Sequence, residues 1–333
     1  MNVAPIPSSI SNKLKSQWFS LTLIVLCMVA WAWPRLGIAL SLDDWTKRLA
    51  ICTIFFFSGL ALRTEEVVRG FSRWPVHLYI QSFCFLFLPL CCWLVLAPWR
   101  ETMPEGLLVG FYLLAVLPTT VTSCVVFSQL SGGVSSVALF NAVVGNMAGV
   151  VLSPTLLILM LGTGGPDIDL DPAAIFLKLC LLVVLPFVLG QVLHWITNVE
   201  QTAWPRRASL INSCCLLTIV YLVFSRTFAA GGWGGQTAAI IWPLAVLAPA
   251  HGLALGLASL GAKALGWSRA ERITVLFCAP QKTLTLGVPL LAACLEANRP
   301  ELLGLASLPM IVYHITQLIA SGFLKDYLVR HAS

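Results

Sequence analysis

The segment FCAPQKTLTLGVPL, residues 277–290, sets a proline, a glutamine and a lysine side by side inside a long apolar stretch. Pro280 lacks an N–H and clashes with the preceding turn, so a helix through this segment breaks there. In lipid, such a break is tolerated only where protein or a water-filled cavity meets the freed backbone groups. The segment therefore predicts a discontinuous membrane-spanning helix within an all-α integral membrane protein.

The composition of the whole chain favours the same class. Of 333 residues, 58% are hydrophobic and 10% are charged. Soluble domains carry roughly 25% charged residues, so a soluble fold of this size could not cover its surface with so few. The net charge of +6 comes from basic residues scattered singly between apolar runs. We therefore expect the lipid bilayer, and no nucleic acid, as the partner of this surface.

Cysteines and sequence motifs give no sign of a cofactor or an enzyme. Most of the eleven cysteines lie inside apolar runs, where thiols behave as small hydrophobic groups. The adjacent pairs at 91–92 and 214–215 do not have metal-binding spacing. The chain also has no GxSxG, HExxH or Walker motif. We expect no resident cofactor and no enzymatic activity.

Ten apolar segments are predicted to span the membrane, for which a helix needs about 20 predominantly apolar residues. They are residues 18–34, 48–62, 76–97, 106–131, 134–161, 174–195, 209–228, 237–261, 272–295 and 302–324. An even number of spans puts both termini on one side. The short flanking segments 1–17 and 325–333 are then tails on that side.

The distribution of lysine and arginine predicts the orientation. Twelve basic residues fall on the side of the termini and five on the other, and the remaining three of the 20 lie inside spans. Because basic residues concentrate in cytoplasmic loops, both termini are predicted to be cytoplasmic, in a plasma or bacterial inner membrane.

The chain divides into two halves that echo one another. Residues 18–161 and 174–324 each hold five spans, and an odd number forces opposite orientations in the membrane. Pro118-Thr-Thr-Val-Thr-Ser in the fourth span matches Pro280-Gln-Lys-Thr-Leu-Thr in the ninth. Chance similarity between apolar sequences is the alternative. A true match predicts two inverted five-helix repeats, as in many secondary transporters.

The fourth and ninth spans carry the candidate site. Each has a proline near its middle followed by hydroxyl and amide side chains. Freed carbonyls and hydroxyl oxygens can coordinate a cation, and half-helix N-termini attract anions. Prolines and threonines also serve as kinks and packing devices in ordinary membrane helices. The candidate binding residues are Thr119, Thr120, Thr122, Ser123, Gln281, Lys282, Thr283 and Thr285.

Lys282 is the most informative residue. The nearest carboxylates along the chain, Glu271 and Glu296, stand at the ends of its span. A lysine at the bilayer centre costs about 2.5–3.5 kcal/mol on insertion scales, and such residues usually face a pathway or a partner. The interface lies too far away for the lysine stem to reach it. We expect its ammonium to bind carbonyls, hydroxyls, a substrate anion or a distant carboxylate.

Further polar residues inside spans are weaker candidates for lining a cavity or bridging helices. His314 and Gln317 are three residues apart, so they share one helix face. Lys178 and Arg226 lie within a few residues of span ends, from which long basic side chains can reach the interface. The weaker candidates are Gln81, Asn146, His314 and Gln317, and Asn141 in the fifth span joins the stronger set.

Two segments resemble a known family. Phe57-Ser-Gly-Leu-Ala-Leu-Arg-Thr-Glu-Glu66 and residues 277–290 resemble the bile acid:sodium symporter superfamily. They are most similar to its branch with the seventh member of solute carrier family 10 and bacterial SBF-like relatives. The resemblance implies a panel domain of spans one, two, six and seven, and a core of the other six. Broken spans four and nine then cross in the core beside two sodium sites.

The resemblance also implies ligands, with two departures. Ser123 and Gln281 match sodium ligands, and Asn141 falls where a threonine ligand sits, so sodium is the candidate coupling ion. However, the glutamate that bridges both sodium sites in the bile-acid branch falls at Phe277, and an asparagine ligand falls at Cys124. A lysine ammonium can occupy the space of one cation, which leaves sodium coupling open.

The sequence thus predicts a secondary-active transporter that moves a small organic anion by alternating access, coupled to sodium or protons. One alternative is a proton-coupled exchanger in which Lys282 itself titrates. From a different class, the chain is a regulatory membrane protein that transports nothing.

Overall fold

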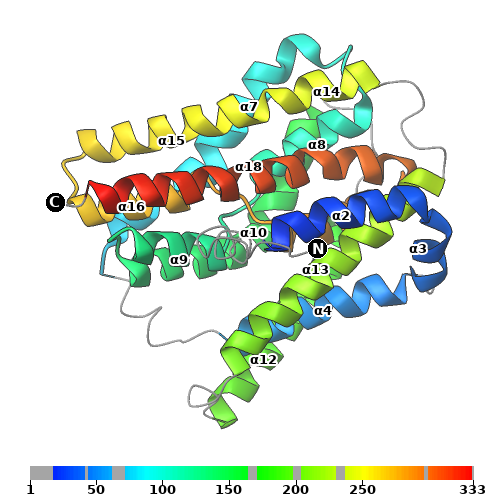
Figure 1. Ribbon diagram of the computed structural model, residues 1–333, viewed down its shortest axis with the longest axis horizontal. Helices are drawn as coiled ribbons and strands as arrows, with labels where there is room; N and C mark the ends of the chain where they lie inside the picture. The colour runs from blue at the N-terminus through cyan, green and yellow to red at the C-terminus, as the bar shows by residue number, and fades with distance from the viewer. Residues whose placement is uncertain are drawn as a thin grey trace, which may run out of the picture.

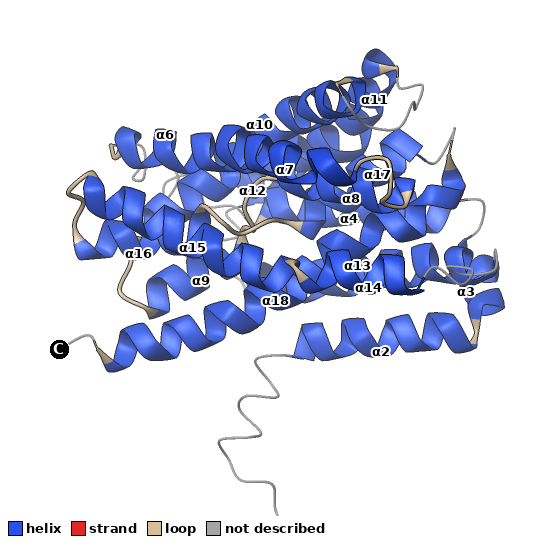
Figure 2. Cartoon of the chain, turned by 90° about the horizontal axis from the view of Figure 1, so that it is seen from above, coloured by secondary structure: helices blue, strands red, loops and turns tan. Residues whose placement is uncertain are grey.

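The computed structural model describes residues 18–41, 44–61, 72–163, 171–197, 204–229, 237–295 and 299–331. All secondary structure in these residues is helical (Figure 2). The α-helices are α2 (Trp18–Ala32), α3 (Pro34–Ser41), α4 (Trp45–Leu60), α6 (Trp74–Ser82), α7 (Leu88–Leu96), α8 (Glu105–Val116), α9 (Thr122–Leu130), α10 (Ser135–Gly162), α11 (Pro172–Leu179), α12 (Leu185–Thr197), α13 (Trp204–Ala229), α14 (Thr237–Ala245), α15 (Leu247–Ala264), α16 (Arg269–Cys278), α17 (Leu284–Leu295) and α18 (Leu303–Arg330). Two π-helical turns, η1 (Phe83–Phe87) and η3 (Cys180–Val184), continue α6 into α7 and α11 into α12. Two 3₁₀ turns, η2 (Ala97–Trp99) and η5 (Pro300–Leu302), lie at helix ends.

Within the described part of the chain, six helical segments are long and apolar enough to cross a membrane. They are Trp74–Trp99, Ser135–Gly162, Ala173–Thr197, Leu210–Ala229, Ile241–Ala264 and Pro300–Arg330. Two shorter apolar helices, α8 and α17, are halves of the predicted fourth and ninth spans. This set supports a multi-pass integral membrane protein. The count of ten spans in two inverted repeats stays a prediction.

Some boundaries differ from those expected. The first span ends at Ala32, and a separate helix, α3, follows it because Pro34 starts a new helix at its first position. The last helix runs to Arg330, so most of the segment predicted as a C-terminal tail from residue 325 is helical. The predicted N-terminal tail, residues 1–17, lies outside the described residues.

The helices pack in two groups. The first, called here the panel group, contains α2, α3, α4, α11, η3, α12 and α13, and its closest pairs are α4 with α12 and α4 with α13. The second, the core group, contains α6 to α10 and α14 to α18, with α8 against α18 as its closest pair. In Figure 1 α4, α12 and α13 lie together, apart from α15, α16 and α9.

Close backbone approach explains the tightest pair of the panel group. A Cβ on Gly59 of α4 would lie 2.1 Å from the Phe187 carbonyl oxygen, and one on Gly190 of α12 would lie 2.1 Å from the Phe56 carbonyl oxygen. Small residues of this kind let membrane helices touch backbone to backbone.

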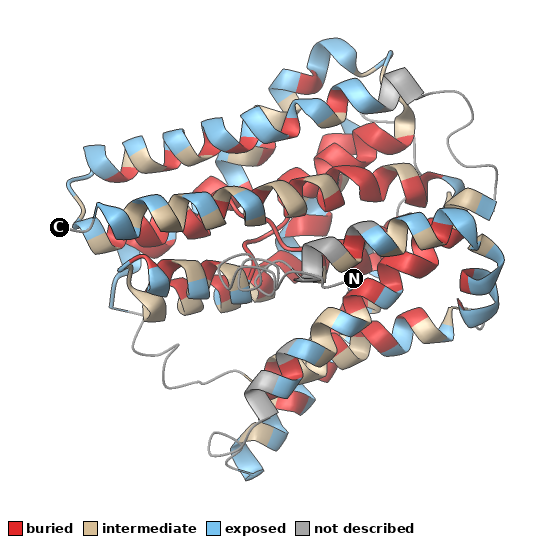
Figure 3. Cartoon of the chain, in the orientation of Figure 1, coloured by how far each residue is buried: buried red, intermediate tan, exposed pale blue. Residues whose placement is uncertain are grey.

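Burial fits a lipid-facing exterior. Along α15, Leu247, His251 and Ala254 are buried, whereas Leu253 and Leu260 are each 64% exposed. Figure 3 shows buried residues concentrated in the central helices and exposed residues on the outer face of α15. The exposed residues of α15 are apolar except Lys263 in its last turn, as expected for a surface that faces a bilayer.

Candidate substrate and cation site at two helix breaks

The fourth and ninth predicted spans are both interrupted. Residues 117–121 separate α8 from α9, and residues 279–283 separate α16 from α17. The two breaks touch, because the Thr283 N–H donates to the Pro118 carbonyl oxygen at 2.9 Å. The prolines therefore interrupt the helices where the sequence predicts, and the interruptions contact one another.

The Lys282 ammonium lies at this contact and is almost fully buried, with 3% exposure. Its Nζ donates to the carbonyl oxygens of Ala115 at 2.7 Å, Leu117 at 2.7 Å and Cys84 at 3.0 Å. An ammonium has three N–H donors, so these carbonyls satisfy it completely. Lys282 forms no ion pair with a carboxylate among the described residues. The contact between the two breaks therefore holds a buried positive charge.

Local backbone geometry frees these three carbonyls. Ala115 lies in the last turn of α8, where carbonyls have no intrahelical partner, and Leu117 has extended backbone. In η1 the Leu88 N–H bonds to Phe83 rather than to Cys84. The next residue, Pro89, has no N–H to offer. The π-turn and the proline together leave the Cys84 carbonyl to Lys282.

The side-chain amide of Gln317 on α18 fixes the backbone of Lys282. Its Oε1 accepts from the Lys282 N–H at 2.8 Å, and its Nε2 donates to the Lys282 carbonyl oxygen at 2.8 Å. The same Nε2 lies 3.0 Å from Nδ1 of His314. His314 and Gln317 thus share a face as predicted, and they support the break rather than line open space.

A cluster of neutral oxygens stands beside Lys282. Oε1 of Gln281 lies 2.6 Å from the Thr120 hydroxyl and 3.0 Å from the Ser123 hydroxyl, and the two hydroxyls also lie within hydrogen-bonding distance of each other. Their two protons serve two of these three contacts at a time. Nε2 of Gln281 donates to the Ser321 hydroxyl at 2.9 Å. Hard oxygen donors of this kind suit an alkali or alkaline-earth cation. The residues present therefore fit a sodium ion at Thr120, Ser123 and Gln281.

The position of the bridging glutamate is apolar. Phe277 is fully buried, and its ring stacks on Phe127 with centroids 5.8 Å apart. Among the described residues, no group of three or more histidine, cysteine, aspartate or glutamate side chains is arranged to hold a metal ion. A cation here would be bound by neutral oxygens.

The remaining threonines of the breaks have separate roles. The Thr283 hydroxyl accepts from the Thr285 N–H at 3.1 Å and so caps α17, while Thr285 is half-buried. Thr119 is buried, and its carbonyl accepts from Asn146 at 3.0 Å. Its hydroxyl has no partner among the described residues. Thr122 is exposed at the first position of α9.

Asn141 does not join the oxygen cluster. Its Nδ2 lies 2.7 Å from Nδ1 of His77 and donates to the Val137 carbonyl at 2.9 Å. Its Oδ1 accepts from Gln81 at 3.2 Å. The structure thus brings Ser123 and Gln281 together, and it sets Asn141 in a second polar group with Gln81 and His77.

Three residues of the crossing have no counterpart in the sequence-based set. Ser321 binds Gln281, the Tyr313 hydroxyl donates to the Pro280 carbonyl at 2.6 Å, and His251 lies 2.9 Å from that hydroxyl. Tyr313, Gln317 and Ser321 follow each other at intervals of four. That spacing is the one signal that could have identified Ser321 and Tyr313 as a polar stripe facing the break.

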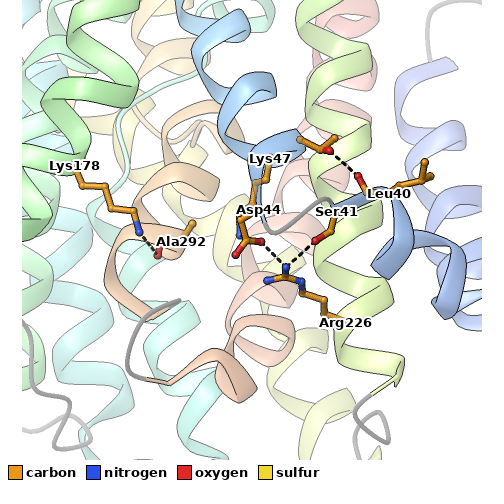
Figure 4. A network of polar contacts seen from close by, with 8 residues as sticks. Leu40, Ser41, Asp44, Lys47, Lys178, Arg226 and Ala292 are labelled. Atoms are coloured by element: carbon orange, nitrogen blue, oxygen red, sulfur yellow. Dashed lines mark hydrogen bonds and ion pairs between the residues drawn. The ribbon is translucent and has the colours of Figure 1, made fainter.

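A further polar cluster lies away from the breaks (Figure 4). Arg226, near the end of α13, pairs with Asp44 at 2.5 Å and donates to the Ser41 hydroxyl at 2.8 Å. Lys47 lies 3.3 Å from the same carboxylate. Arg226 therefore joins α13 to the start of α4, close to the end of its predicted span.

Comparison with known proteins covers nearly the whole chain. The model of the SBF-like CPA transporter family matches residues 17–330. The sodium/bile acid cotransporter 7-A of Xenopus laevis is 31% identical over 321 residues, covering 94% of this chain and 92% of that protein. The sodium/bile acid cotransporter 7 of Rattus norvegicus is 30% identical over 320 residues, with the same coverage. The putative symporter YfeH of Escherichia coli K12 is 26% identical over 324 residues, covering 92% of this chain and 91% of that protein.

Proposed function

Because this chain belongs to the SBF-like CPA transporter family, we propose that it is a secondary-active transporter that moves a small organic anion by alternating access. Membership of that family makes the chain a membrane transporter and not an enzyme. Beyond family membership, we propose an organic anion as the substrate, alternating access as the mechanism, and the identity of the coupling ion.

The observation that carries the proposal is the buried ammonium of Lys282 between two touching helix breaks. No carboxylate pairs with it among the described residues, so the crossing has an excess positive charge. The N-terminus of α9, with Val121 and Thr122 exposed, adds partial positive charge near the same break. Such a field favours an anionic substrate over a neutral or cationic one.

For coupling, we favour one sodium ion at the cluster of Thr120, Ser123 and Gln281. The relatives from Xenopus laevis and Rattus norvegicus carry the name sodium/bile acid cotransporter, and the three oxygens are hard donors of the kind that sodium prefers. The Lys282 ammonium takes the place of a second cation. Among the described residues, Lys282 Nζ donates to three backbone carbonyls and to no hydroxyl. The sequence-based prediction included hydroxyls as well as carbonyls.

Proton coupling at Lys282 is the second candidate. A neutral amine has two N–H donors in place of three, so deprotonation leaves at least one of the three carbonyls unpaired. Loss of the proton would thereby loosen the contact between the two breaks. A non-transporting regulatory protein is the remaining alternative, and a failure of all transport assays would favour it.

The proposed topology keeps the sequence-based scheme. Ten spans form two inverted repeats, residues 18–161 and 174–324, with both termini cytoplasmic in a plasma or bacterial inner membrane. Reporter fusions at residue 168 and at both termini test it, and a cytoplasmic reporter at 168 would contradict it.

Uptake by purified protein in liposomes tests the function. A panel of radiolabelled organic anions is offered with sodium or choline outside, and with or without a pH gradient. We expect saturable uptake of at least one anion, driven by the sodium gradient and weakened by Ser123→Ala. Dependence on the pH gradient alone would instead favour proton coupling. The matched control is Ser82→Ala, because Ser82 is exposed on α6.

A further inference from the structure

The panel and core groups meet at one end of the molecule. The panel helix α11 and the turn η3 pack against α10 and α17, and α13 packs against α17 and α18. By contrast, the half-helices α9 and α16 pack on α6, α10, α15, α18 and each other. Among the described residues they make no substantial contact with α4, α12 or α13. In Figure 1 α9 and α16 lie at the opposite end from α8 and α14.

The boundary between the panel and core groups is called the seam here, and its first contact is steric. A Cβ on Gly304, in the first turn of α18, would lie 2.0 Å from the Thr227 Oγ1 and 2.3 Å from its Cγ2. Real Cβ atoms do not approach other atoms so closely, so only glycine lets α13 reach α18 here.

The second contact is polar. Nζ of Lys178 on α11 donates to the Ala292 carbonyl oxygen at 3.4 Å. Ala292 lies in the last turn of α17, where carbonyls lack intrahelical partners and carry the negative end of the helix dipole. A cation from the panel group therefore caps a half-helix of the core group. Figure 4 shows the side chain of Lys178 directed at Ala292.

Arg226 braces this end of α13 from the panel side. Its pairing with Asp44 and Ser41 ties the last turns of α13 to α3 and α4. The next residue, Thr227, faces Gly304. These bonds hold the end of α13 to the rest of the panel group. We therefore expect α13 to separate from α18 only when the panel group moves as a unit.

We propose that these two contacts, Thr227 against Gly304 and Lys178 on Ala292, are the gate that closes this end of the transport path. The inference rests on the proposed function, since a gate has meaning only where access alternates. In this conformation the gate is closed, and at the other end α9 and α16 make no substantial contact with the described panel helices α4, α12 and α13. Opening requires the loss of the Lys178 bond and withdrawal of Thr227 from Gly304.

The test measures exposure of the Lys178 amine in the full-length protein in nanodiscs. A membrane-impermeant sulfonated acylating reagent is applied, and modified lysines are quantified by mass spectrometry, with exposed Lys263 as the internal reference. Gly304→Ala should wedge the seam and raise the Lys178-to-Lys263 ratio several-fold. Adding Thr227→Gly removes the clashing atoms and should return the ratio to the wild-type value.

An unchanged ratio in folded Gly304→Ala protein would overturn the gate, as would a rise that Thr227→Gly does not reverse. If Gly304→Ala does not fold, Lys178→Met takes its place. It should speed hydrogen exchange in the last turn of α17 several-fold, while Lys178→Arg, which retains a donor, stays near wild type. Equal exchange in Met and Arg variants contradicts the proposal. Lysine labelling and hydrogen exchange are both measured without substrate. A failure of anion uptake therefore contradicts the proposed function, whereas the labelling and exchange results test the contacts between the panel and core groups.

Discussion

The side-chain amide of Gln317 pairs with the peptide of Lys282 on both sides, accepting from its N–H and donating to its carbonyl, each at 2.8 Å. The amide makes the two hydrogen bonds that a neighbouring backbone segment would make. At Lys282 the helix is interrupted, so no helical backbone group makes them. Because the break lies inside the protein, water is not at hand to take over these bonds.

Gln317→Leu should therefore destabilise the protein strongly. The substitution leaves a buried N–H and a buried carbonyl unpaired, each at a cost of about 1–3 kcal/mol. Thermal unfolding in detergent, followed by tryptophan fluorescence, should show a clearly lower midpoint. Gln129→Leu is the matched control, since Gln129 is exposed on α9, and it should change the midpoint little. Equal midpoints for both variants would show that the Gln317 bonds are dispensable.

Lys282→Met should abolish anion uptake or change its dependence on sodium and pH, while the protein still inserts. The methionine fills the volume but cannot donate to the carbonyls of Ala115, Leu117 and Cys84. Lys282→Arg should fail as well, because a planar guanidinium does not fit three carbonyls arranged around a compact ammonium. Uptake by the Met variant with wild-type sodium and pH profiles would assign Lys282 a purely structural role.

The sequence predicts the breaks and their lysine because proline and a charged residue inside lipid each allow few alternatives. It does not predict which faces meet. The resemblance places Asn141 with the sodium ligands, yet its side chain contacts Gln81 and His77. Ser321 is recognisable only through its spacing of four residues from Gln317 and eight from Tyr313, because a single serine in a long apolar helix is otherwise unremarkable. The π-turn that frees the Cys84 carbonyl depends on packing between helices, which local sequence does not encode.

Stability should also fall at acidic pH through Glu271, at the start of α16 and outside the spans. Hydrogen bonding from Ser268, with help from Arg73 at 3.0 Å, lowers the pKa of the Glu271 carboxyl below its usual value. A lowered folded-state pKa stabilises the fold above the unfolded-state pKa, and the contribution disappears as pH falls through the lowered value. Unfolding midpoints measured from pH 7 to pH 3 should drop less steeply for Glu271→Gln than for wild type. Parallel curves would contradict this.

The last prediction concerns the backbone contact between α4 and α12. Gly190→Ala puts a methyl group 2.1 Å from the Phe56 carbonyl oxygen, and that atom belongs to the backbone, so no rotamer change relieves the clash. The two helices must separate, which removes close packing along the tightest pair of the panel group. We expect a loss of about 1–3 kcal/mol, the usual cost of overpacking, read from the unfolding midpoint in detergent. Gly256→Ala on α15 is the matched control, since nothing lies within 4 Å of its added Cβ. Alanine has a higher helix propensity than glycine, so this control should hold or raise the midpoint. A Gly190→Ala protein as stable as the Gly256→Ala protein would mean that α4 and α12 do not touch at these glycines.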